Sequence, residues 1–322
     1  MIFYVPLERI ESRYTTHLDR DIISYLESSN LNYRRIHGLG FKRSPAPPSG
    51  CFLNYSYTIK FKMAQLQEIA KLFEDGLVSD GDVFWFSDLW FPGIESIAYM
   101  NYFAKKKIKI KGVIHAGSWT DTDFVRGMER WAKCFEDCLF DLVDEVYVGT
   151  NFSAQQLIER RLIDPSKVVV TGLPIDSKLP NDLPPKEDIV VFNGRLCDEK
   201  QPHLFDLLKE RVSPLFPDAK FVKTMELGLN REDYIDLLGR AKVCVSYALQ
   251  ENFGYGLIEA ALQGCVPVVP DRLSYKEIFK DIFRYSTFKE SVDMTVNALR
   301  GDVPSTRPKI SSNNTIFKRW FL

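Results

Sequence analysis

Gln250-Glu251-Asn252-Phe253-Gly254-Tyr255-Gly256-Leu257-Ile258-Glu259 is the stretch of sequence that decides the fold. Predicted strands flank it at Lys242–Ser246 and Val266–Val269, and a helix is predicted from Tyr255 to Gln263. A strand-loop-helix turn of this kind directs backbone N–H groups and the positive end of a helix dipole toward the space above a sheet. The loop therefore suits a diphosphate. Glu259, eight positions after Glu251, can accept hydrogen bonds from vicinal hydroxyls.

Bulk composition is that of a globular protein with two domains. The chain has 322 residues, 45% hydrophobic and 26% charged, with a net charge of −1. This balance excludes binding of nucleic acid through overall charge, so any such binding needs a local patch. No apolar run is long enough to span a membrane, and the six cysteines show no CxxC spacing. We expect reduced thiols, a cytoplasmic protein, no membrane association and no obligate protein partner.

Apolar strands alternate with amphipathic helices throughout, which is typical of an α/β protein with parallel sheets. In the first half, strands are predicted at Ile2–Val5, Tyr33–Ile36, Val83–Phe86, Lys109–His115, Glu145–Gly149 and Val168–Thr171, and helices at Thr16–Ser28, Ile59–Glu74, Ile94–Ala104, Phe124–Asp141 and Ser153–Arg160. After a linker rich in Pro and Asp, the second series adds strands at Ile189–Asn193 and Lys220–Lys223 and helices at Pro202–Glu210, Arg231–Arg240 and Phe288–Leu299. Two successive Rossmann-like domains follow from this order.

Arg195 and Lys200 lie between the first predicted strand of the second series and the helix that follows it. Taken alone, they read as surface ions at a helix start. With Glu251 and Glu259 further along the chain, the segment Gly194-Arg195-Leu196 to Lys200 resembles the donor site of retaining GT-B glycosyltransferases, especially family four. The resemblance implies two Rossmann-like domains with an interdomain cleft. It also implies an acceptor-binding domain over residues 1–175, a nucleotide-sugar-binding domain over 186–305, and a tail over 306–322 that packs back on the first domain.

The same resemblance assigns donor roles. Arg195 and Lys200 would hold the diphosphate, Arg195 as a fork and Lys200 as a point charge. Glu259 would bind the ribose hydroxyls, and Glu251 would lie near the transferring sugar. The turn residues would line the donor, chiefly with backbone groups: Gly194, Asn252, Phe253, Gly254 and Tyr255. A nucleotide sugar, with UDP as the default, is then a co-substrate, and no cofactor is expected.

His115 follows an apolar strand in Gly112-Val113-Ile114-His115-Ala116-Gly117. A lone histidine is often a satisfied structural residue, but its position matches the histidine that family members present to the transferred sugar. The resemblance implies front-face attack in which the leaving phosphate takes the acceptor proton, so His115 would position and polarise. Asp121-Thr122-Asp123 resembles a metal-binding Asp-x-Asp, yet it precedes a predicted helix at Phe124. An N-cap explains it better, and we expect no metal.

The region from Ser28 to Gln67 contains six cations and no Asp or Glu, with aromatic residues interleaved. Such a composition is expected where a polyanion with exposed bases is bound. Candidate acceptor contacts are Arg34, Arg35, Lys42 and Arg43 from this region, Arg13 and Tyr14 from the loop after the first strand, and Trp90 and Trp119 near strand ends. The alternatives are a solvated charged loop for Arg13 and Tyr14 and core packing for the tryptophans.

Nearly the whole chain looks like phage-encoded glycosyltransferases. The shared segments are Val5 to Glu8, Asp88 to Glu95, His115 to Gly117, Gly127 to Ala132 and Leu249 to Gly254. That resemblance implies a hydroxymethylated pyrimidine in phage DNA as the acceptor, with the base extruded from the stack. Three alternatives stay open: a tRNA base such as queuosine, a saccharide or lipid-linked glycan, and a non-catalytic nucleotide-sugar-binding module. A dinucleotide-binding oxidoreductase is disfavoured because no G-x-G-x-x-G follows an early strand.

Overall fold

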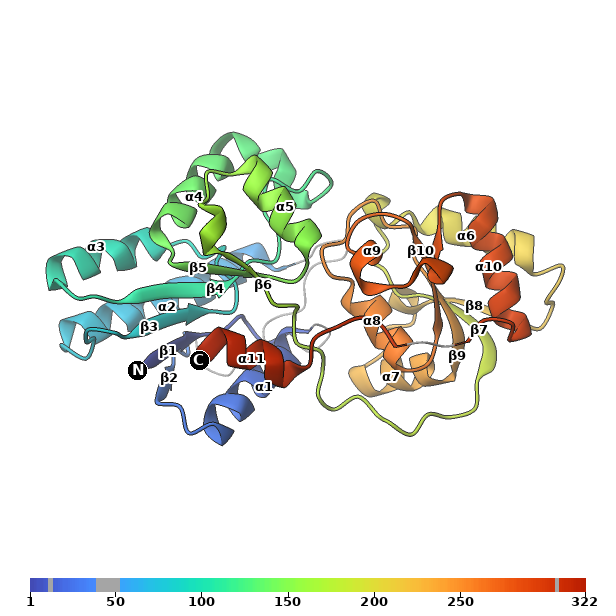
Figure 1. The fold of residues 1–322 in the computed structure, drawn as a ribbon, viewed down its shortest axis with the longest axis horizontal. Helices are drawn as coiled ribbons and strands as arrows, with labels where there is room; N and C mark the ends of the chain where they lie inside the picture. The colour runs from blue at the N-terminus through green and yellow to red at the C-terminus, as the bar shows by residue number, and fades with distance from the viewer. Residues whose placement is uncertain (11–13, 39–52, 305–306) are drawn as a thin grey trace. The chain divides into compact units, whose positions relative to one another are not determined.

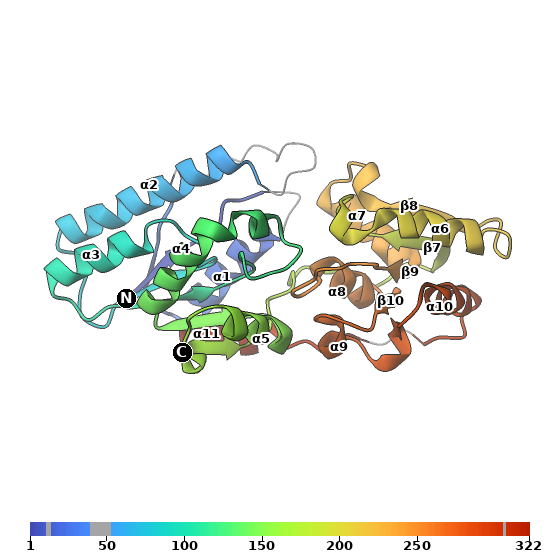
Figure 2. The ribbon, with the colours of Figure 1, turned by 90° about the horizontal axis from the view of Figure 1, so that it is seen from above.

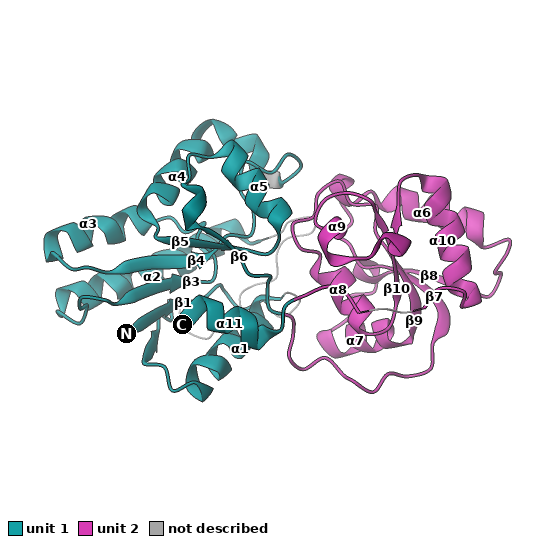
Figure 3. Cartoon of the chain, viewed as in Figure 1, with its two compact units in different colours: residues 1–174, 311–322 teal, residues 175–310 magenta. Residues whose placement is uncertain are grey.

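The computed structural model describes residues 1–10, 14–38, 53–304 and 307–322. They form two compact units, residues 1–174 with 311–322 (unit 1) and residues 175–310 (unit 2), coloured separately in Figure 3. The boundary expected at residue 175 lies one residue from the first break between the units. The segment expected as a linker, residues 171–188, lies in unit 1 up to residue 174 and in unit 2 from residue 175.

Unit 1 contains a six-stranded parallel sheet in the order β2-β1-β3-β4-β5-β6 (Figure 1). Its strands are β1 (Ile2–Val5), β2 (Tyr33–Arg35), β3 (Val83–Phe86), β4 (Lys109–Val113), β5 (Glu145–Val148) and β6 (Val168–Val170). Its helices are α1 (Thr15–Ser28), α2 (Tyr55–Glu74), α3 (Ile94–Ala104), α4 (Glu129–Leu142), α5 (Asn151–Arg160), α11 (Asn313–Phe321) and the 3₁₀ turns η1 (Phe124–Met128) and η2 (Pro165–Lys167).

The two faces of this sheet bury different side chains because strand residues alternate. Phe3, Phe84 and Phe86 lie in one core together with residues of α2, α3, α4 and α5. Figure 2 shows α2 and α3 side by side along this layer. Trp85 faces the other way, and its ring lies 5.0 Å from that of Trp320 in α11. The C-terminal tail is therefore a helix that belongs to unit 1.

Polar caps set the starts of two predicted helices, and only one of these caps was predicted. The side chain of Asn54 accepts a hydrogen bond from the backbone N–H of Tyr57, so α2 begins at Tyr55, four residues earlier than predicted. The helix predicted from Phe124 begins instead as η1, capped by Asp123, whose side chain accepts from the N–H of Val125. Asp123 is thus an N-cap, as predicted.

Unit 2 contains a five-stranded parallel sheet in the order β11-β10-β9-β7-β8. Its strands are β7 (Glu187–Phe192), β8 (Lys220–Lys223), β9 (Ala241–Val245), β10 (Val266–Pro270) and β11 (Arg284–Tyr285). Its helices are α6 (Pro202–Val212), α7 (Arg231–Arg240), α8 (Tyr255–Leu262), α9 (Tyr275–Ile278), α10 (Phe288–Arg300) and the 3₁₀ turns η3 (Asp198–Lys200), η4 (Thr224–Glu226) and η5 (Asp281–Phe283).

Each sheet has a point where the strand order reverses. In unit 1 the chain runs from β1 to β2 in one direction and from β3 to β6 in the other, so the reversal lies between β1 and β3. In unit 2 it lies between β7 and β9. Open α/β sheets bind ligands beyond the carboxyl ends of the strands at such reversals. A ligand site is therefore expected among the residues that follow β1, β3, β7 and β9.

Candidate active site

The loop after β7 carries the two predicted cations. Arg195 is hydrogen-bonded to Glu199, and the Lys200 ammonium donates to the carbonyl of Gln250 and to Glu251 Oε2, the latter at 3.2 Å. Lys200 is largely covered, with 12% of its side chain exposed, whereas Arg195 keeps 38%. Arg195, Lys200 and Glu251 therefore lie in one cluster at the reversal point of unit 2.

Glu199 is a site residue that the sequence analysis missed. Its carboxylate contacts Arg195 and lies 3.7 Å from the Lys200 nitrogen, and its backbone carbonyl accepts from the N–H of Leu249 at 2.7 Å. It thus holds both cations and ties the loop after β7 to the loop after β9. The only sign of this role in the sequence is that Glu199 lies four residues after Arg195, a spacing that allows an ion pair.

Two glycines shape the start of α8. Gly254 has a φ of 85°, a left-handed conformation that favours glycine, and it directly precedes the helix. A Cβ on Gly256 would lie 2.9 Å from the side-chain nitrogen of Asn193, so α8 closely approaches the residue after β7 and a larger residue would displace Asn193. Of the other predicted donor residues, Gly194 and Asn252 are half-buried in these loops. Phe253 is 5% exposed, and its ring packs 5.1 Å from that of Tyr255.

Glu259 lies in a second cluster with Arg231, the first residue of α7. Arg231 forks both carboxylate oxygens, at 2.6 and 3.0 Å, and also donates to Asp176 at 3.2 Å. Burial raises the pKa of Glu259, and the hydrogen-bonded guanidinium opposes that rise. Burial lowers the pKa of Arg231, but the bonds to Glu259 outweigh it and hold this pKa above its ordinary value. Arg231 and Asp176 were not predicted.

In unit 1, His115 lies beside the reversal point between β1 and β3. Its Nε2 is 3.0 Å from the carbonyl oxygen of Ser87, the residue after β3, so Nε2 carries the proton there. The imidazole ring lies 5.4 Å from the ring of Tyr14 at a tilt of 49°. The structure therefore brings together two of the predicted residues, His115 and Tyr14.

A buried network supports the His115 loop. Glu136 accepts from the backbone N–H and hydroxyl of Ser118, at 2.7 and 2.6 Å, and from Arg161 Nε at 2.7 Å. Trp90 Nε1 donates to the same carboxylate at 3.2 Å. The side chains of Glu136 and Arg161 are 0% and 1% exposed. One carboxylate thus holds the loops that follow β3 and β4, and no local pattern in the sequence indicates this role.

The remaining acceptor candidates are dispersed. Arg34 is exposed on the edge strand β2, while Arg35 donates to Asp19 at 2.7 Å and keeps 11% exposure. Trp119 is 3% exposed within the core of unit 1, which favours the core-packing alternative, and Trp90 is half-buried against Phe135. Arg13, Lys42 and Arg43 lie outside the described residues.

Two cations of the region from Ser28 to Gln67 form ion pairs with carboxylates of unit 1. The Lys62 ammonium donates to the Trp90 carbonyl at 2.5 Å and lies 3.6 Å from Asp88, with 7% of its side chain exposed. Arg35 is likewise paired with Asp19. Of the four described cations in this region, Arg34 and Lys60 are the exposed ones.

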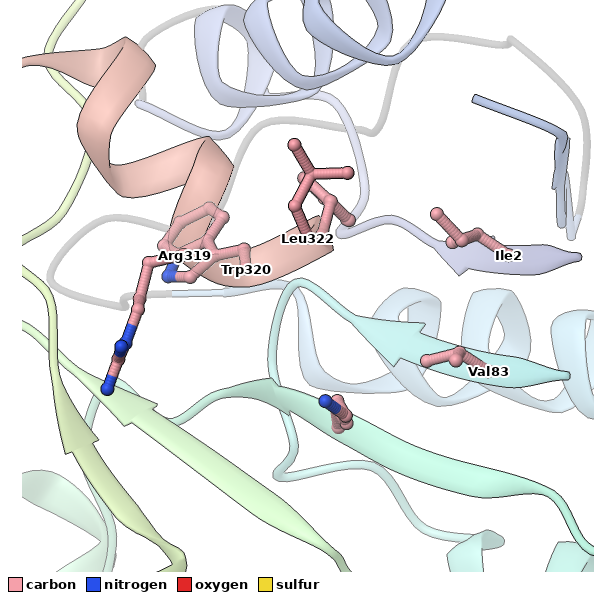
Figure 4. Close-up of a pocket in the computed structure, with 7 residues that line it drawn as sticks. Ile2, Val83, Arg319, Trp320 and Leu322 are labelled. Atoms are coloured by element: carbon pink, nitrogen blue, oxygen red, sulfur yellow. The ribbon is translucent and has the colours of Figure 1, made fainter. Parts of the chain in front are cut away.

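One small cavity of unit 1 lies against α11, about 70 Å³ in volume and lined in part by Ile2, Val83, Trp320 and Leu322 (Figure 4). It is far smaller than the several hundred Å³ typical of ligand pockets. Within the described ranges, no helix is long and apolar enough to cross a membrane. The same part of the chain holds no group of three or more His, Cys, Asp or Glu side chains suited to a metal ion.

Comparisons with known proteins agree with this architecture. No family model matches the chain. The tRNA-queuosine alpha-mannosyltransferase of Drosophila melanogaster is 32% identical over 114 residues, which make up 34% of this chain and 26% of that protein. The chain thus spans about a quarter of the length of that relative.

Solved structures share its fold, and two of them illustrate the match. The lipopolysaccharide outer core galactosyltransferase WaaB, in its apo form, has a TM-score of 0.60 at 12% identity and covers 99% of this chain and 94% of its own. A mutant of S. aureus TarM in complex with Fondaparinux, alpha-GlcNAc-glycerol and UDP has a TM-score of 0.53 at 15% identity. That match covers 80% of this chain and 54% of TarM. The two parallel-sheet units define the GT-B fold, as the sequence predicted.

Proposed function

We propose that the protein is a glycosyltransferase and that unit 2 binds its nucleoside-diphosphate-sugar donor. The observation that carries this proposal is the convergence of Arg195, Lys200 and Glu251 where the strand order of unit 2 reverses. Glu259, which follows in α8, supplies a buried carboxylate for the ribose. The UDP in the TarM complex and the mannosyltransferase relative support the same chemistry.

A bound diphosphate would replace the carboxylates of Glu199 and Glu251 as the partner of Arg195 and Lys200. In the structure, Arg195 pairs with Glu199, and Lys200 pairs with Glu251. A bound diphosphate offers these cations more negative charge, and still more accumulates on the leaving oxygen as the sugar departs. Arg195 and Lys200 then stabilise the leaving group electrostatically, which removes the need for a metal ion.

We assign a retaining course to the transfer, as the resemblance to family four implies. The leaving phosphate takes the proton of the acceptor hydroxyl, and the new glycosidic bond forms on the face from which the diphosphate leaves. Glu251 contacts the transferring sugar, and His115 positions and polarises a hydroxyl group. Its protonated Nε2 is committed to the Ser87 carbonyl in the structure, which holds the ring in one orientation.

For the acceptor we propose a modified nucleobase, with a hydroxymethylated pyrimidine of phage DNA as the first candidate. The exposed Arg34 and Lys60 and the interleaved aromatic residues support a polyanionic acceptor. A tRNA base is the second candidate, favoured by the match with the tRNA-queuosine mannosyltransferase. Both acceptors present a hydroxyl group on a base within a polyanion.

The test is incubation with a panel of UDP- and GDP-linked sugars and three acceptors: hydroxymethylated DNA, queuosine-containing tRNA and a simple saccharide. Digested nucleosides are then analysed by mass. A mass increase of one sugar on one nucleoside is expected. Binding of a nucleotide sugar without transfer or donor hydrolysis would favour the non-catalytic module, and sugar on the saccharide alone would exclude the nucleobase acceptors.

A further inference from the structure

We infer that Arg231 positions Glu259 to accept both ribose hydroxyls of the donor, so that Arg231 determines the recognition of ribose. The inference rests on the proposed function of unit 2 as a nucleoside-diphosphate-sugar site. It adds a positioning residue outside the two loops that carry Arg195, Lys200 and Glu251.

The hydrogen-bond geometry leaves the right number of acceptor positions. An ionised carboxylate offers about four lone-pair positions, two on each oxygen. Arg231 occupies one on Oε1 and one on Oε2, and in the described part of the chain it is the only side-chain partner of Glu259. Each oxygen keeps one acceptor position, and a ribose brings two hydroxyl donors. A two-point fork also fixes the plane of the carboxylate, which one point charge cannot do.

The guanidinium also opposes the protonation of Glu259. The Glu259 side chain is 5% exposed, and burial of this kind favours the protonated form of a carboxyl group. A protonated carboxyl would donate a hydrogen bond and lose acceptor capacity. The bidentate contact with Arg231 opposes that change.

Arg231 is itself held in place from two sides. Its Nη2 donates to Asp176, whose side chain is 9% exposed, and its guanidinium carbon lies 5.6 Å from the centre of the Tyr234 ring. Arg231 keeps 35% exposure while Glu259 keeps 5%. A ribose that reaches Glu259 therefore lies against Arg231. Opening the pair would leave a buried charge without its partner, which is unfavourable, so the pair persists when the donor binds.

The experiment measures the Kd of UDP, 2′-deoxy-UDP and 3′-deoxy-UDP by titration calorimetry, with the ADP and GDP series if the base differs. In the wild type, removal of either hydroxyl is expected to raise Kd about tenfold or more. In Arg231→Gln, the Kd of the ribonucleotide should rise and the ratio of deoxy to ribo Kd should fall below about threefold. Arg231→Lys keeps the charge without the fork, and its ratio should lie between the two.

Arg240→Gln is the matched control, because Arg240 ends the same helix and pairs with Glu187 at 3.2 Å and with Asp236. It should keep the wild-type ratio. If Arg231→Gln fails to fold, Arg231→Lys decides. Arg231 variants that keep the wild-type ratio, or that bind UDP more tightly, overturn the inference and leave the proposed function intact. A wild type that binds no nucleoside diphosphate overturns both.

Discussion

Replacement of Glu136 by Ala tests the network beneath the His115 loop. The change removes the nearer carboxylate partner of Arg161, a guanidinium that is 1% exposed and that lies 3.7 Å from Glu129, and it removes the acceptor for the Ser118 N–H. Breaking a buried ion pair from one side costs about 3–5 kcal/mol because a buried charge loses its close partner, and Glu129, 38% exposed and 3.7 Å away, replaces Glu136 only in part. Domains of this kind are stable by about 5–15 kcal/mol. We therefore expect Glu136→Ala to remove roughly a fifth or more of the stability of unit 1.

Tryptophan fluorescence measures this loss in unit 1 alone, since all five tryptophans of the chain, at positions 85, 90, 119, 131 and 320, belong to unit 1. With a urea dependence of about 2 kcal/mol per M, the unfolding midpoint should fall by about 2 M. The double change Glu136→Leu with Arg161→Met should destabilise less than Glu136→Ala, because it leaves no buried charge. Asp75→Ala, in an exposed pair with Lys71, serves as the control and should barely move the midpoint.

A loss below about 1 kcal/mol in Glu136→Ala would falsify the assignment of Glu136 as a buried anchor. A double variant less stable than Glu136→Ala would refute the charge argument and would show that side-chain packing at these positions matters more. Loss of turnover in Glu136→Ala under conditions where unit 1 is folded would further tie the network to the orientation of His115.

Lys200→Ala should lower kcat/KM at least about tenfold, since one charge-assisted contact to the diphosphate contributes roughly 1.5–3 kcal/mol; Lys209→Ala, on an exposed face of α6, should match the wild type in the same transfer assay. Arg34→Ala should weaken binding to the nucleic-acid acceptor and lower its salt dependence without changing donor hydrolysis, and binding equal to wild type counts against the acceptor site. EDTA should leave the transfer rate unchanged, and restoration of lost activity by Mg²⁺ or Mn²⁺ would disprove metal independence. Binding of UDP should weaken as pH falls through the raised pKa of Glu259, and the midpoint should lie higher in Arg231→Gln.

The alternating pattern predicted most of the strands and helices along the chain because each element carries its own period. The strands Ile2–Val5 and Val83–Phe86 are apolar on both faces, as buried parallel strands require, and they occur within the predicted bounds. The turn from Glu251 to Gly256 was also predicted, because glycines mark it in the sequence. In the structure Gly254 has a left-handed conformation and directly precedes α8. Short elements such as α9 and β11 have too few residues to show a period.

The partners of the site residues escaped prediction because they depend on strand order. Arg231 lies 28 positions from Glu259 and 55 from Asp176, and Arg161 lies 25 from Glu136. Nothing local in the sequence links such residues. Arg231 meets its partners because α7 follows β8 at one edge of the sheet of unit 2 and leads back to β9, which lies beside β7. Arg161 meets Glu136 because α4 and α5 cover the same face of the sheet of unit 1.

The helix α11 gives the two units an unusual order of completion during synthesis. Its Trp320 covers Trp85 and Tyr147 and donates to Thr171, yet the whole of unit 2 is translated between those residues and α11. At about 5–20 residues per second, the ribosome needs roughly 7–30 s to make that stretch. Throughout this interval the nascent first unit exposes an aromatic surface to chaperones and proteases. The unit that is translated second is thus the first that can finish folding.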